Sequence, residues 1–381
     1  MTPHAEAETG IRHDVQAFLH GNWRPTEDPA RIAQFRRRAG AAGYLYRSIP
    51  TAYGGSGQVF DLTRGAIIRQ EFTRARAPVE LGCNGVAMLV PTLLEHGTED
   101  QKQRIIRPTI EGEIDWAQGY FEPQAGSDLA SLRTRAERRG GEWVINGHKI
   151  WSSHADRCRF MFLLARSVPG SRRQEGITYL LLDLHQPGVE IRPIRAINGE
   201  RRFCEVFLTD ARTPADWTVG PEGDGWRVSK STLKHERVSI GDIDRIPFDQ
   251  LLSLARRQVI DGRPAIQHPR MRERLAAIDG ARQALRHSQS RQLAMRTAGQ
   301  EPGLFDLVSK LFLTGILQDV SALARELMGD AALLEPGPGA GAERWNNQFM
   351  GSLGTAIAGS ASNIQRNIIA ERGLGLTRDT D

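Results

Sequence analysis

The hydrophobic period of this sequence changes twice, and this change constrains the fold more than any other feature. Apolar residues recur at helical spacing through the first third of the chain, for example over 62–74. From Trp116 they fall in short β-rich runs bounded by turn residues, and helical spacing returns after Gly225. The pattern predicts an α+β chain with a helical domain over 1–115, a central β domain over 116–225 and a C-terminal helical domain over 226–381.

Local signals predict some elements more closely. Thr98 precedes two acidic residues, so we expect a helix to begin there, with acidic side chains in its first turn. Asn146-Gly147 lies between alternating apolar residues, which is a strong signal for a β-hairpin turn. The β-rich runs FMFLLARS, GITYLLLDL, VEIRPIRA and CEVFLTDARTP then predict further strands.

Composition excludes several classes of protein. No apolar run approaches the roughly 20 residues of a membrane span, and the N-terminus has no apolar secretory segment. Cys83, Cys158 and Cys204 are far apart, so we expect reduced thiols in a cytoplasmic protein and no metal site. The net charge of +5 comes mostly from Arg, and we find no nucleic-acid-binding motif, so we expect no nucleic-acid partner.

Four segments carry a resemblance to a known family. They are PTLLEHGTEDQKQRIIRPTIEGEIDWAQGYFEPQAGSDLASLRTRAER, WVINGHKIWSSHADRCRFMFLLAR, CEVFLTDARTPADWTVGPEGDGW and SNIQRNIIAERGLGL. In this order they resemble the acyl-CoA dehydrogenase family of flavoproteins, over most of the chain. The resemblance implies an N-terminal helical domain, a central β-barrel or sandwich domain and a C-terminal four-helix bundle.

The resemblance also implies FAD as cofactor. It puts Gly126 where the chain approaches the cofactor closely, Ser127 at a pyrophosphate oxygen, Trp151 beside the flavin ring and Ser153 toward the reactive N5 atom. The cofactor candidates are Gln118, Tyr120, Phe121, Gly126, Ser127, Trp151, Ser153, Asn363 and Gln365, and the substrate candidates are Ser127 and Arg237. A structural β-turn around Gly126 and a core aromatic at Trp151 are the simpler alternatives.

The chemistry of the family needs a carboxylate base that removes the α proton of an acyl thioester. Many members carry this Glu just before the C-terminal signature, where this sequence has Gly359. A second arrangement in the family places the Glu on the first helix after the β domain, and Glu236 in LKHERVSIG matches it. We therefore expect Glu236 to be the base; the alternative is an ordinary solvated helix Glu. We expect its neighbour His235 to be a surface or packing residue.

Some positions depart from the family pattern. Phe121 stands where Thr or Ser usually bonds the flavin, Ser360-Ala361 replaces Gly-Thr, and Asn363 replaces Glu or Gln. Two alternative functions therefore stay open. One is a flavin-poor partner subunit that completes the site of a catalytic homologue. The other is an enzyme of the same fold that acts on another thioester, or as an oxidase or monooxygenase.

The resemblance implies partners as well as a reaction. RRQVIDGRPAIQHPRMRERLA resembles a bacterial branch that includes steroid side-chain enzymes with two kinds of subunit. We expect an acyl-CoA substrate, with a bulky or branched acyl group favoured, and an electron-transfer flavoprotein as electron acceptor. We expect a tetramer, and the sequence leaves open whether it is a homo- or a heterotetramer.

Overall fold

The computed structural model describes residues 3–59, 61–240, 246–333 and 342–377. These residues form two compact units. The first comprises Met1–Ile194 with Arg201–His235, and the second comprises Arg195–Glu200 with Glu236–Asp381. The long helix α6 (Gly225–Ile240) contributes residues to both units, because the division falls between His235 and Glu236. The three-domain boundaries expected from the sequence stay a prediction.

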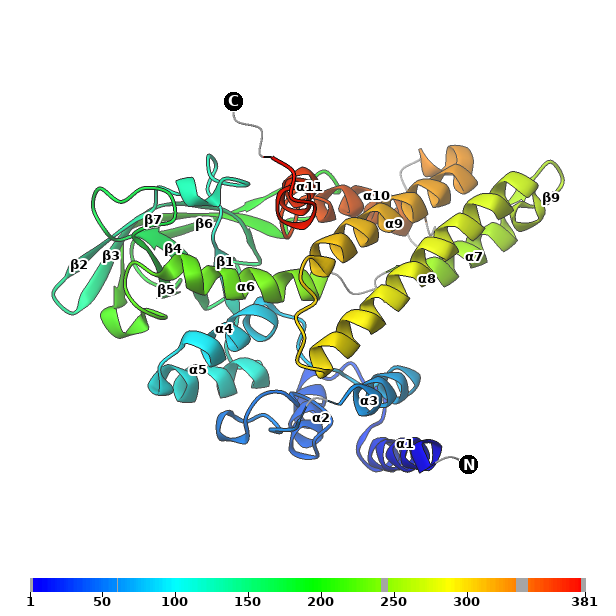
Figure 1. Cartoon of the computed structure of the whole chain (residues 1–381), viewed down its shortest axis with the longest axis horizontal. Coiled ribbons are helices and arrows are strands. Elements are labelled where there is room, and N and C mark those ends of the chain that lie inside the picture. The colour runs from blue at the N-terminus through cyan, green and yellow to red at the C-terminus, as the bar shows by residue number, and fades with distance from the viewer. Residues whose placement is uncertain (1–2, 60, 241–245, 334–341, 378–381) are drawn as a thin grey trace. The chain divides into compact units, whose positions relative to one another are not determined.

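Helices form the N-terminal part of the first unit (Figure 1). They are α1 (Pro3–Asn22), α2 (Pro29–Ala41), α3 (Leu62–Arg74), α4 (Val90–His96) and α5 (Glu99–Glu111). The helix expected to begin at Thr98 is confirmed as α5. The Thr98 hydroxyl accepts a hydrogen bond from the Gln101 amide at 3.2 Å, and the Gln101 side chain accepts one from the Thr98 amide at 3.1 Å.

The β region of the first unit is a seven-stranded sheet, as the alternation of the sequence predicted (Figure 1). Its strands are β1 (Trp116–Gly119), β2 (Arg135–Arg139), β3 (Glu142–Ser153), β4 (Phe160–Arg166), β5 (Ile177–Asp183), β6 (Val189–Ile194) and β7 (Phe203–Pro214). The order is β1-β4-β2-β3-β7-β6, and β5 pairs with β4. Both faces are buried: Phe162 packs on one face with the N-terminal helices, and its neighbours Met161 and Leu163 pack on the other.

The expected hairpin at Asn146-Gly147 is wrong. Both residues lie inside β3, where the pairing with β7 shifts register between Ile145 and Gly147. A Cβ at Gly147 would come within 2.2 Å of the Thr134 hydroxyl, so this glycine permits close approach of two chain segments. The turn that joins β2 to β3 lies instead at residues 140–141, because Arg139 pairs with Glu142.

Helices make up most of the second unit. They are the end of α6, α7 (Phe248–Arg257), α8 (Pro269–Thr297), α9 (Phe305–Met328), α10 (Ala342–Thr355) and α11 (Ser362–Ile368), and a short β8–β9 pair (Val259–Ile260 with Arg263–Pro264) follows α7. In Figure 1, α8 and α9 run side by side. The expected C-terminal helical bundle is confirmed.

The helix α9 is also apolar enough to pass for a membrane span. Within the part of the chain that the structure describes, Leu307–Ala332 meets the length and composition of a span, with a mean hydropathy of 1.4. The absence of a membrane span that the sequence led us to expect stays a prediction, because this test uses length and composition alone. The most apolar stretch of this helix is 61% buried inside the protein, and a core helix of a bundle meets the same test, so this is weak evidence for a span.

Candidate functional site

The candidate cofactor residues of the first unit lie on two segments that are bonded together. The Ile150 amide on β3 donates to the Phe121 carbonyl at 2.9 Å, so the turn after β1 is joined to the strand that carries Trp151 and Ser153. The turn itself closes with a pair of backbone hydrogen bonds between Glu122 and Ala125, at 3.1 and 3.0 Å. The structure therefore brings together the two motifs that carried the resemblance in the β region.

A buried ion pair lies beneath this junction. The ammonium of Lys149, which is fully buried, lies 2.8 Å from a Glu122 carboxylate oxygen and also donates to the Tyr120 carbonyl at 3.2 Å. The Glu122 carboxylate accepts two further bonds, from the amides of Arg133 at 2.7 Å and Thr134 at 2.9 Å. Each charge is thus compensated by a partner, which a buried ion requires.

The Glu122–Lys149 pair fixes the ionisation of the carboxylate. Burial raises the pKa of Glu122, but the charge of Lys149 and the hydrogen bonds outweigh it and hold the pKa below its ordinary value. Sequence reasoning missed both residues as part of the site, although both lie in the quoted motifs. The available signal was a charged residue at an inward position of a β pattern.

Trp151 is presented at an irregularity of β3. The pairing with β7 shifts register between Lys149 and Ser152, and Trp151 has a left-handed backbone with φ of 61°. Its indole is 53% exposed and meets the Phe203 ring edge-on at 5.9 Å. A β-bulge of this kind re-aims a side chain, and here it leaves a flat aromatic face open to a ligand. The alternative of a core aromatic does not fit this exposure.

The other candidates of the first unit divide by exposure. Gly126 and Ser127 are exposed, and a Cβ at Gly126 would meet nothing within 4 Å, so there is room beside the turn. Ser153 and Gln118 are half-buried. The side chain of Tyr120, in contrast, is fully buried against Phe162 and Tyr179, so only its backbone remains for a cofactor.

The catalytic candidate Glu236 belongs to the second unit and is half-buried. Burial lowers the pKa of Lys310, an α9 side chain with no exposed surface, to about 8, and the charge of Glu236 opposes this shift. The partial burial of Glu236 differs from that of an ordinary solvated helix Glu. The side chain of Arg237 lies outside the described residues. His235 is partly exposed and bonds Glu95 at 3.0 Å, as expected of a surface residue.

The C-terminal candidates lie on α11. Gln365 is fully buried, and its amide nitrogen donates to the Gly359 carbonyl at 3.1 Å, so it holds the position where many family members carry their base. Asn363 is exposed and accepts a hydrogen bond from Arg366 at 3.0 Å. Their roles toward a cofactor stay predictions.

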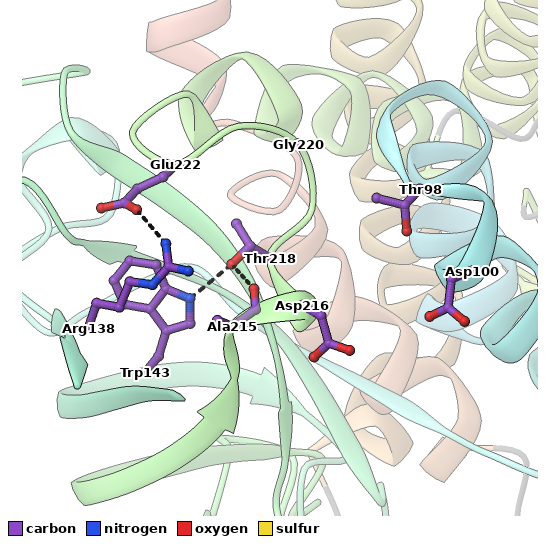
Figure 2. A pocket seen from close by; sticks show the side chains of 9 residues that line it. All are labelled: Thr98, Asp100, Arg138, Trp143, Ala215, Asp216, Thr218, Gly220 and Glu222. Atoms are coloured by element: carbon purple, nitrogen blue, oxygen red, sulfur yellow. Dashed lines mark hydrogen bonds and ion pairs between the residues drawn. The ribbon is translucent and has the colours of Figure 1, made fainter. Parts of the chain in front are cut away.

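A pocket elsewhere in the first unit contains none of the predicted residues. Figure 2 shows this cavity of about 360 Å³, where Arg138 lies 3.6 Å from Glu222 and the Trp143 indole donates to the Thr218 hydroxyl at 2.9 Å. Its lining residues are Thr98, Asp100, Arg138, Trp143, Ala215, Asp216, Thr218, Gly220 and Glu222. Three carboxylates against one Arg make it a poor site for the phosphates of a nucleotide.

Metal and thiol chemistry have no visible site within the described ranges. No group of three or more His, Cys, Asp or Glu side chains among those residues could hold a metal ion. Cys83, Cys158 and Cys204 are free thiols, and burial raises the pKa of Cys158 to about 12. Such a thiol is protonated at neutral pH and unreactive.

The chain matches known proteins along nearly its whole length. Models of the acyl-CoA dehydrogenase N-terminal, middle and C-terminal domains match residues 5–113, 117–211 and 223–374. Acyl-CoA dehydrogenase IpdE1 of Mycobacterium tuberculosis is 40% identical over 352 residues, which cover 91% of this chain and 88% of that protein. Isovaleryl-CoA dehydrogenase of Pongo abelii is 28% identical over 61% of this chain and 57% of its own.

Solved structures agree with these matches. A chain of the ChsE4-ChsE5 complex from Mycobacterium tuberculosis superposes with a TM-score of 0.79 at 26% identity, over 100% of this chain and 99% of that chain. The Tcur3481-Tcur3483 steroid ACAD gives the same TM-score of 0.79 at 26% identity and covers 98% of both chains. The protein therefore belongs to the acyl-CoA dehydrogenase family and is an oxidoreductase that acts on acyl-CoA.

Proposed function

We propose that the protein catalyses FAD-dependent α,β-dehydrogenation of an acyl-CoA thioester to the trans-2-enoyl-CoA, with Glu236 as the base. The observation that carries this proposal is the position of Glu236, which is half-buried on α6, the first long helix after the β region, in the segment LKHERVSIG that matches one arrangement of the family. A carboxylate held beside the thioester can act as the general base that removes the α proton. Family membership supplies the reaction type.

The residues of the first unit fit a flavin. The half-exposed indole of Trp151 offers a flat face, and the open space beside Gly126 admits a bulky group. Exposed Ser127 and half-buried Ser153 offer hydroxyl donors for phosphate oxygens and a ring nitrogen. FAD, when bound, supplies the acceptor for the hydride that leaves the β carbon. Phe121 brings no hydroxyl, which costs roughly 1 kcal/mol of binding, or about fivefold in affinity.

The side chains of this protein have separate roles in the proposed reaction. The Glu236 carboxylate takes the pro-R α proton of the thioester, and Arg237 and Ser127 contact the CoA part of the substrate. The Glu122–Lys149 pair keeps the cofactor segment joined to β3, so that Trp151 holds its orientation. Proton transfer by a positioned side chain contributes typically 10²–10⁴-fold to the rate.

The substrate and partners are proposed from the relatives. Similarity to a steroid ACAD favours a bulky acyl group, such as a steroid side chain. The ChsE4-ChsE5 complex consists of two differently named proteins, which keeps a heterotetramer open beside a homotetramer. We propose an electron-transfer flavoprotein as electron acceptor and a cytoplasmic location.

A flavin-poor partner subunit is the second candidate function. The observation that favours it is the loss of family residues at the cofactor: Phe121 replaces a hydroxyl residue, and Ser360-Ala361 replaces Gly-Thr. In this case the chain would complete the site of a catalytic homologue without turning over acyl-CoA itself.

Purification distinguishes these two functions. We expect yellow protein that shows flavin absorbance and bleaches anaerobically with a bulky acyl-CoA. Colourless protein that takes up no added FAD would overturn the proposal in favour of the partner subunit. Native mass spectrometry of the same material then shows whether a second subunit co-purifies.

Substitution tests the base directly. We expect Glu236→Gln to lower kcat by about 10²–10⁴-fold, because the amide cannot accept the α proton. The matched control is Glu273→Gln, which changes an exposed Glu on α8 of the same unit and should leave kcat unchanged. Turnover of Glu236→Gln at the rate of the parent would refute the base assignment.

A further inference from the structure

A buried pair of hydroxyl groups joins α6 to α4 within the first unit. The hydroxyls of Thr92 and Thr232 lie 2.9 Å apart, and neither side chain has exposed surface. Thr92 also donates to the Met88 carbonyl at 2.8 Å, and the Thr232 hydroxyl lies 3.4 Å from that of the fully buried Tyr179. Buried hydroxyls require such partners, so this pair fixes which face of α6 meets α4.

Two further contacts between α4 and α6 lie beside the hydroxyl pair. The His96 ring bonds the Ser231 hydroxyl at 2.7 Å, and the His235 ring bonds the Glu95 carboxylate at 3.0 Å. The side chains of His235 and Glu95 are 26% and 42% exposed, so their interaction contributes at most about 1 kcal/mol. Loss of one partner from the buried pair costs more, about 1–3 kcal/mol, because the hydroxyl left behind has no water to bond.

The proposed base lies on the same face of α6 as this pair. Glu236 follows Thr232 by four residues within one continuous helix. Side chains with this spacing are neighbours on a helix surface, with Cβ atoms about 5–6 Å apart. Thr92 therefore holds the turn of α6 directly before Glu236, and the contact of Glu95 with His235 holds the adjacent residue.

We propose that Thr232 is a positioning residue for Glu236, because its bond to Thr92 fixes the rotation of α6 about its axis and so the direction of the carboxylate that removes the α proton. This inference rests on the proposed function, in which Glu236 is the base. A base must lie within hydrogen-bond reach of the proton, and a displacement of about 1 Å can lower the rate by about 10²-fold. The competing explanation is a purely structural hydroxyl pair that stabilises the fold without directing Glu236.

Substitutions of similar size at Thr232 test the inference. Thr232→Val removes the hydroxyl, and Thr232→Ser keeps it. We expect Val to lower kcat by about 10-fold, with KM for acyl-CoA and flavin content changed less than about threefold, and Ser to recover most of the kcat. The kinetic isotope effect on kcat with an acyl-CoA deuterated at the α carbon should rise in the Val variant, because proton removal then limits the rate to a greater extent. Thr92→Val breaks the same pair from α4 and should give the same pattern, so the test does not depend on one variant.

Thr213→Val is the matched control. It also removes a buried hydroxyl of the first unit, one that donates to the Leu181 carbonyl at 2.6 Å and so joins β7 to β5. Each of the Val variants should lose stability in denaturant unfolding, because a buried hydrogen bond is lost. Thr213→Val should nevertheless keep the kcat and the isotope effect of the parent.

The outcomes separate a positioning role from a structural one. A Thr232→Val protein with the kcat and isotope effect of the parent would overturn the inference and leave a structural hydroxyl pair. An equal loss of kcat in Thr213→Val would overturn it too, because the loss would then follow from reduced stability. If Glu236→Gln keeps full kcat, the base assignment of the proposed function fails instead, so the two failures are distinguishable.

Discussion

Trp151 in the first unit and Ser360 in the second unit have backbone conformations that side chains rarely adopt. Trp151 has φ of 61° and Ser360 has φ of 91°. Such conformations cost about 1–3 kcal/mol each and persist where the surrounding structure imposes them. At Ser360 the surrounding structure is the Lys310 ammonium, and at Trp151 it is the register shift of β3 against β7. The surrounding structure therefore imposes the backbone conformation of each of these two residues.

The exposed indole of Trp151 gives a prediction at the residue scale. We expect Trp151→Ala to weaken FAD binding by up to about tenfold, because an aromatic contact contributes about 0.5–1.5 kcal/mol beyond burial. Trp151→Phe keeps a flat ring and should recover most of this affinity. Fluorescence titration of the apoprotein with FAD measures both. Equal affinity of the Ala variant and the parent would return Trp151 to the role of a surface aromatic.

Single residues show where sequence reasoning succeeds and where it fails. Glu236 could be proposed because a motif fixes its position, and Thr98 because a helix start has a local chemical signature. The structural roles of Lys310 and Lys149 could not be predicted, because the partners of both ammonium groups lie far away along the chain. The hairpin prediction at Asn146-Gly147 was wrong because a glycine there can serve either a tight turn or the close approach of two chain segments. The position of Thr134 beside Gly147 shows that the second reason applies.

At the scale of elements, the Glu122–Lys149 pair joins the turn after β1 to β3. We expect Glu122→Gln to lower the free energy of unfolding by about 3–5 kcal/mol, because it leaves the buried ammonium without its counter-charge. The matched control is Glu137→Gln on β2, whose exposed ion pair with Arg139 at 2.9 Å is worth at most about 1 kcal/mol. Denaturant unfolding of both variants gives the comparison.

The same pair predicts a pH dependence. The pKa of Glu122 is held below its ordinary value of 4.5 in the folded protein. Its stabilising contribution is therefore present above that value and is lost as pH falls through the folded pKa. The difference in unfolding free energy between parent and Glu122→Gln should shrink as the pH is lowered below about 4.5. A difference that stays constant into this acidic range would contradict an ionised Glu122.

Whole-molecule assembly concerns the second unit. Several of its large apolar side chains remain exposed, although the helices around them bury a continuous core. They are Phe305, Phe312, Leu353, Ile357, Leu374 and Leu376. Scattered exposed apolar residues are normal, and exposed apolar side chains such as those of Phe305 and Phe312 on α9 and Leu353 on α10 are also what a further subunit would cover. The tetramer expected from the family would use these last helices, an arrangement that no short sequence pattern could specify.

Substitution of exposed apolar residues by Glu tests whether they take part in subunit association. We expect the double substitution Phe312→Glu with Leu353→Glu to lower the native mass from that of an oligomer toward a monomer, because both side chains are about half exposed on α9 and α10 and a buried carboxylate is unfavourable in an interface. Val259→Glu on β8 changes another exposed apolar residue of the same unit and should leave the mass unchanged. Light scattering after size exclusion measures all three proteins. An oligomer that survives the double substitution would assign assembly to a different surface, and loss of assembly in Val259→Glu as well would mean that added charge alone disrupts it.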